Sequence, residues 1–104
     1  MSPSRVAAGL LWLSALTHIS QIWVYPGEAS VPGAAFFGLI YAGIGFGLWR
    51  GGRQWAWAGV ILPTLGGTLG ILRFLYAHPN PFSIFHVAID LVVIGICVWL
   101  LRTK

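Results

Sequence analysis

Residues 82–101 read FSIFHVAIDLVVIGICVWLL, an apolar stretch of 20 residues with one acid and no lysine or arginine. An α-helix rises 1.5 Å per residue, so about 20 residues cover the roughly 30 Å of hydrocarbon in a lipid bilayer. A surface helix of a soluble protein would instead carry charged residues along its exposed face. The stretch therefore predicts a transmembrane helix.

Three further apolar segments of similar length come before it, near residues 6–24, 33–49 and 55–76. The links between the segments are short and rich in glycine and proline, which end helices. Short links force consecutive helices to run antiparallel. We therefore predict an all-α integral membrane protein, with residues 1–104 forming a single transmembrane domain that is an up-down four-helix bundle.

The overall composition supports a lipid-facing surface. Charged residues make up 8% of the chain and hydrophobic residues 58%, and the mean hydropathy is +0.84. A soluble domain has about 25% charged residues. The bases occur in ones and twos, so we expect the lipid bilayer and not nucleic acid as the partner. Glycines four residues apart, Gly43 with Gly47 and Gly66 with Gly70, allow close helix packing, within one chain or in a homo-oligomer or larger membrane complex.

The distribution of charge predicts the orientation in the membrane. One side of the predicted bundle collects five of the six strong bases, namely Arg5, Arg50, Arg53, Arg102 and Lys104. The other side holds Glu28 and Arg73. Because positive residues stay in the cytoplasm, both termini are expected to be cytoplasmic. The expected location is the plasma (inner) membrane of a prokaryote.

Two of the apolar segments carry a polar stripe. Residues three or four positions apart share one face of a helix. The stripes consist of Ser14, Thr17, His18 and Gln21 in the first segment and of Ser83, His86, Asp90 and Cys97 in the fourth. Both are expected to face the bundle interior, since a polar group without a partner in lipid costs roughly several kcal/mol.

The titratable residues of these segments gather in the outer half of the predicted bundle. The first and fourth helices of an up-down bundle are neighbours, so His18 and His86 are expected to lie close together. Asp90 lies one turn deeper and needs a partner, because a charge at the bilayer centre costs about 2.5–3.5 kcal/mol. His86, on the same helix face, is the favoured partner of Asp90, and Arg73 is a second candidate.

Several functions fit these residues. The leading interpretation is an accessory or structural component of a membrane assembly, in which polar side chains hydrogen-bond helices together. The first alternative is a redox-cofactor protein, in which His18 and His86 hold a haem or a quinone near Asp90 and Arg73. The two histidines and Asp90 are also candidate metal ligands.

A further alternative makes Asp90 the titrating group and the candidate catalytic residue. The protein would then be a proton-coupled small transporter or a membrane-embedded acid–base enzyme. The sequence has no nucleotide-binding glycine loop and no cysteine pair, which soluble enzyme chemistry of those kinds would require. It therefore favours a function that is not enzymatic.

Overall fold

The computed structural model describes residues 2–103 of the chain. These residues form the helices α1 (Pro3–Val24), α2 (Val31–Arg50), α3 (Arg53–Tyr76) and α4 (Pro81–Arg102). All four are long and apolar enough to cross a membrane, which confirms the prediction of an all-α chain with four candidate membrane spans. Lys104, one of the predicted orienting bases, lies outside the described residues.

The local sequence explains where the helices begin and end. Pro81 is the first residue of α4, and Pro3 is the first residue of α1. Proline is favourable at this position because the backbone N–H that it lacks would have no partner within the helix. Asn80 caps α4, its side-chain oxygen accepting a 2.9 Å hydrogen bond from the backbone N–H of Ser83. Gly51 ends α2 with a φ of +81°, a left-handed conformation that favours glycine. The caps make the helices slightly longer than the apolar segments.

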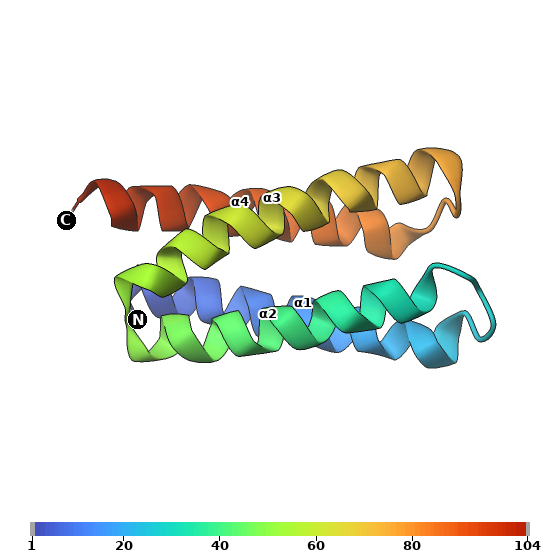
Figure 1. Ribbon diagram of the computed structural model, residues 1–104, viewed down its shortest axis with the longest axis horizontal. Helices are drawn as coiled ribbons and strands as arrows, with labels where there is room; N and C mark the ends of the chain where they lie inside the picture. The colour runs from blue at the N-terminus through green and yellow to red at the C-terminus, as the bar shows by residue number, and fades with distance from the viewer. Residues whose placement is uncertain (1, 104) are drawn as a thin grey trace.

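The helices pair into two hairpins (Figure 1). α1 packs along α2, and α3 packs along α4, while both chain ends lie at the same end of the bundle. The hairpins meet mainly where α1 contacts α4. Only Gly51 and Gly52 separate α2 from α3, yet these two helices contact each other less than any other pair of consecutive helices, and Figure 1 shows α3 running diagonally away from α2. The N-terminal end of α2 and the C-terminal end of α3 therefore stand apart.

Close packing within the first hairpin depends on particular glycines. A Cβ atom on Gly38 would lie 3.0 Å from the Ala15 carbonyl oxygen and 3.0 Å from the His18 Cβ, so a side chain has no room there. Gly43, by contrast, has no such neighbour within 4 Å. Gly43 is one of the glycines whose four-residue spacing predicted close helix packing. The prediction does not hold for Gly43, which faces away from the other helices.

Replacing Gly38 by leucine should separate α1 from α2. We expect Gly38→Leu to destabilise the bundle by about 1–3 kcal/mol, because the new side chain must displace α1 backbone and His18. Gly43→Leu is the matched control and should leave stability unchanged or raise it, since leucine favours helix and the site is open. Thermal unfolding in detergent measures both; equal loss in the two variants would contradict the packing argument.

Candidate functional site

Polar side chains connect the two hairpins. Thr17 of α1 and His86 of α4 share a hydrogen bond of 2.6 Å, and Tyr41 of α2 donates a 2.9 Å hydrogen bond to Asp90 of α4. A third group of contacts surrounds Arg73 near the C-terminal end of α3. Within residues 2–103, each side chain–side chain hydrogen bond between different helices joins one hairpin to the other.

The histidines of α1 and α4 stack face to face. The ring centroids of His18 and His86 lie 3.6 Å apart and the ring planes differ by 8°, so the predicted proximity is confirmed. His18 Nδ1 lies 2.7 Å from the carbonyl oxygen of Ser14, which only accepts hydrogen bonds, so Nδ1 carries the hydrogen. In neutral His18, Nε2 is therefore left as a hydrogen-bond acceptor.

This stacking does not fit a haem ligated by both histidines. Such a haem needs one imidazole nitrogen on each side of the iron, and nitrogen lone pairs lie in the ring plane. In parallel rings 3.6 Å apart, the lone pairs of His18 and His86 do not point at a shared position between them. In addition, no group of three or more His, Cys, Asp or Glu side chains within residues 2–103 is arranged to hold a metal ion.

Asp90 has a different partner from the one predicted. Its carboxyl group is buried and accepts a hydrogen bond from the Tyr41 hydroxyl, while His86 is turned toward Thr17 and Arg73 toward the loop between α1 and α2. The prediction that His86 or Arg73 pairs with Asp90 was therefore wrong. Residues four apart share a helix face, but the contact of Asp90 with α2 decides its partner.

Tyr41 is the functional-site residue that the sequence analysis missed. It is fully buried near the middle of α2, and it packs edge-on against the ring of His18 at a centroid distance of 5.5 Å. The signal was present in the sequence, because tyrosines of membrane proteins gather near the interfaces and a buried phenol needs a hydrogen-bond partner. A tyrosine in the centre of an apolar segment thus points to an intramembrane polar contact.

Arg73, in the last turn of α3, connects this helix to the first hairpin. Its guanidinium group donates to Ser30 Oγ at 2.6 Å, to Gln21 Oε1 at 2.7 Å and to Glu28 Oε1 at 3.3 Å. Glu28 lies in the loop between α1 and α2, where hydrogen bonds from Ser30 and the neighbouring Arg73 lower the pKa of its carboxyl group. The ionised pair of Arg73 and Glu28 bridges the gap between α3 and the first hairpin at the end where α2 and α3 diverge.

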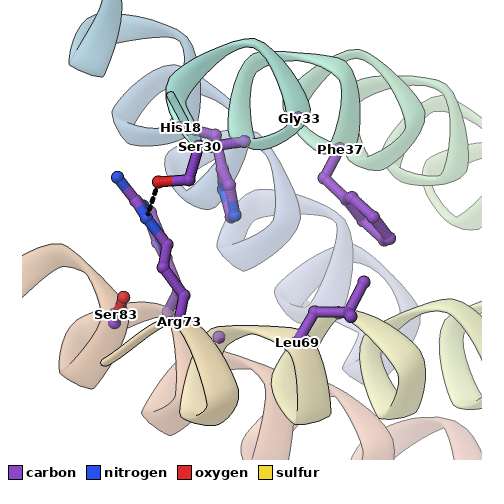
Figure 2. A pocket seen from close by; sticks show the side chains of 11 residues that line it. His18, Ser30, Gly33, Phe37, Leu69, Arg73 and Ser83 are labelled. Atoms are coloured by element: carbon purple, nitrogen blue, oxygen red, sulfur yellow. Dashed lines mark hydrogen bonds between the residues drawn. The ribbon is translucent and has the colours of Figure 1, made fainter. Parts of the chain in front are cut away.

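A cavity of about 200 Å³ lies beside the contacts of Arg73 and is partly open at the surface of the protein. Figure 2 shows Arg73 and Ser30 meeting on one side of the cavity and Phe37 and Leu69 on the other, with His18 behind them. All four helices contribute to its wall. The lining residues are His18, Ser30, Gly33, Ala34, Phe37, Gly66, Leu69, Gly70, Arg73, Ser83 and His86.

The wall of the cavity is mostly apolar, but a few of its polar groups have unused hydrogen-bond donors or acceptors. His18 Nε2 accepts a hydrogen bond in the neutral ring, as argued above. Ser83 Oγ accepts a hydrogen bond from Asn80 at 3.0 Å, which leaves its hydroxyl hydrogen to donate. The guanidinium group of Arg73 has five N–H donors and uses three of them in the contacts above. The cavity can therefore bind a molecule with a polar head and an apolar body.

The length and apolar composition of the four helices are those of a small multi-pass membrane protein, and the cavity with its polar groups lies between the two helical hairpins. Comparison with known proteins found no matching family model, no similar curated protein and no similar solved structure. Of the predicted site residues, His18, His86 and Arg73 line the cavity, and Asp90 does not.

Removing the Tyr41 hydroxyl should destabilise the bundle. Tyr41→Phe leaves the Asp90 carboxyl without its donor, at a cost of about 1–3 kcal/mol in the free energy of unfolding. Tyr76→Phe is the control, since Tyr76 is 82% exposed. In a double-mutant cycle with Asp90→Ala, which removes the acceptor of this hydrogen bond, the two changes should be non-additive. Additive losses would mean that the two side chains do not interact.

The contact between Arg73 and Glu28 should make stability depend on pH. Because the folded state lowers the pKa of Glu28, the stabilisation is complete above the ordinary value of 4.5 and is lost as pH falls through the lower folded pKa. Wild-type protein should therefore lose more thermal stability on acidification through this range than Glu28→Gln. Parallel pH profiles of the two proteins in detergent would show that Glu28 does not act in this way.

Proposed function

We propose that this protein binds a small amphipathic molecule taken from the lipid phase. The observation that carries the proposal is the partly open cavity of about 200 Å³ between diverging helices, whose apolar wall presents a few convergent polar groups. Packing alone does not require such a cavity, because side chains in a protein interior normally fill the space between helices at a density close to that of organic crystals.

The entrance favours a ligand that arrives sideways through the bilayer. The cavity lies between α2 and α3, the pair of neighbouring helices with the least contact. Gly33 on the α2 side is exposed and has open space where a Cβ would be, and Leu69 on the α3 side is 44% exposed. A flexible apolar tail can pass between Gly33 and Leu69.

A quinone, the first alternative from the sequence, matches the polar groups best. A quinone carbonyl accepts a hydrogen bond, which the Ser83 hydroxyl and the remaining N–H groups of Arg73 can donate. In the reduced form, a quinol hydroxyl donates, and His18 Nε2 is available to accept. The ring and tail would lie against Phe37 and Leu69, which face each other across the cavity (Figure 2).

The remaining hypotheses relate to this proposal in different ways. Hydrogen bonds between the hairpins support the structural role of the polar stripes, and an accessory function in a larger assembly or homo-oligomer stays a prediction. Asp90 lies outside the cavity wall, which makes direct proton exchange with a ligand less favoured. The charge distribution supports cytoplasmic termini, which would place the cavity in the outer half of the membrane. A location in a prokaryotic inner membrane stays a prediction.

Filling the cavity should weaken binding strongly without unfolding the protein. Isothermal titration calorimetry with a short-chain benzoquinone, on protein in nanodiscs, measures the dissociation constant. Gly33→Leu should weaken binding about tenfold or more, because the side chain occupies cavity space with no neighbour to displace. Ser83→Ala, which loses one hydrogen bond, should weaken binding about two- to tenfold.

Gly95→Leu is the matched control, because Gly95 is exposed on α4 and a Cβ atom there would also meet no other atom within 4 Å. It should bind the quinone like the wild type. Equal affinity in wild type and Gly33→Leu would show that the quinone binds elsewhere. No saturable binding to the wild type would overturn the quinone assignment.

A further inference from the structure

The cytoplasmic end of the predicted topology carries positive charge that the chain itself does not neutralise. The protein has two acids, and both are engaged elsewhere: Glu28 contacts Arg73 in the outer loop, and Asp90 is buried against Tyr41. The opposite end of the bundle holds four arginines of the described residues, namely Arg5, Arg50, Arg53 and Arg102. Their counter-charge must come from outside the protein.

Two of these arginines line one groove. It lies where α1 begins and α2 ends, and its wall includes Arg5, Arg50 and the hydroxyl-bearing Ser2 and Ser4, with Trp49 beside them. The positive end of the α1 dipole and the negative end of the α2 dipole meet here and offset each other, so the positive charge of the groove comes from the two guanidinium groups. Ser4 donates its hydroxyl hydrogen to the Leu48 carbonyl oxygen, whereas Ser2 accepts from the Arg5 backbone N–H and keeps its own hydrogen to donate. The groove thus combines charge, one free hydroxyl donor and an aromatic side chain.

Arg5 is held in place within this groove. Its Nε donates a hydrogen bond to the Trp49 carbonyl oxygen at 3.4 Å, and its guanidinium carbon lies 4.7 Å from the centre of the Trp49 ring. The contact over the aromatic ring orients the planar guanidinium group. It leaves four of the five N–H donors for a ligand. A fixed guanidinium fork suits the paired oxygens of a phosphate.

We propose that this groove binds the phosphate headgroup of an anionic phospholipid. A lipid is favoured over a soluble phosphate because the groove lies at the end of two membrane-spanning helices and beside a tryptophan, a residue typical of the headgroup region. The headgroup phosphate contacts Arg5 and Arg50, and the acyl chains follow the apolar surface of the bundle. The site lies at the opposite end from the quinone cavity and does not depend on it.

Native mass spectrometry tests the site by counting lipid adducts on the intact protein in detergent. Phosphatidylglycerol is the probe, and phosphatidylcholine, whose headgroup has no net charge, is the reference lipid. We expect Arg5→Gln and Arg50→Gln each to reduce phosphatidylglycerol binding about fivefold. Arg5→Lys should recover part of that binding, because it restores the charge but not the guanidinium fork.

Arg53→Gln and Arg102→Gln are the matched controls. They remove the same charge at the same end of the bundle, but neither residue lines the groove; Arg53 instead donates to the Leu101 carbonyl oxygen at 3.0 Å. Both controls should bind phosphatidylglycerol within about twofold of the wild type. Equal losses in all four variants would mean diffuse attraction between membrane and protein, which overturns a defined site.

Two further measurements keep the outcome unambiguous. If soluble glycerol phosphate displaces phosphatidylglycerol at equal concentration, the ligand is a free phosphate and the lipid assignment is wrong. Circular dichroism of each variant shows whether it folds. Arg50→Gln is the more secure variant, because Arg50 is exposed at the end of α2, whereas Arg5 also contacts Trp49. Benzoquinone binding should be unchanged in Arg50→Gln.

Discussion

The hydrogen bonds between the two hairpins are the interaction on which the bundle depends. Within each hairpin, glycines such as Gly38 let the helices pack closely. Between hairpins, lipid provides no hydrophobic force, because acyl chains are as apolar as leucine. The contacts of Thr17 with His86 and of Tyr41 with Asp90 supply a polar attraction that lipid cannot replace. They also fix the rotation of α4 relative to α1 and α2, because a rotated helix would expose polar groups to acyl chains.

The cavity follows from where these contacts lie. They connect α4 to α1 and α2, while α3 packs on α2 through contacts such as Trp55 on Gly47 and Tyr41 on Gly66, and reaches the first hairpin again through Arg73. A two-residue link holds α2 and α3 together at one end, and the arginine spans the gap at the other. The space between is bordered by glycine, so small side chains keep it open. Structural and binding roles of the polar residues are therefore compatible, since each contact uses part of a group's hydrogen-bonding capacity.

Several features were accessible from the sequence and others were not. Four apolar segments separated by proline and glycine predicted four helices, because span length is set by the thickness of the bilayer. The two polar stripes also led to the proximity of His18 and His86. The partner of Asp90 was missed, since a helical pattern shows which residues share a face but not which neighbouring helix that face meets. The divergence of α2 and α3, and hence the cavity, depends on packing over all four helices and has no local signature.

Because the cavity opens sideways between α2 and α3, the ligand concentration that sets its occupancy is the concentration in the membrane. A ligand that enters from the bilayer first partitions into it, so occupancy of the proposed cavity follows the mole fraction of the ligand among the lipids. Its solubility in water matters only through that partition. Two molecules with identical contacts to Ser83 and Arg73 would then differ in occupancy if their tails partition differently. Part of the selectivity of such a site lies in the membrane and not in the protein.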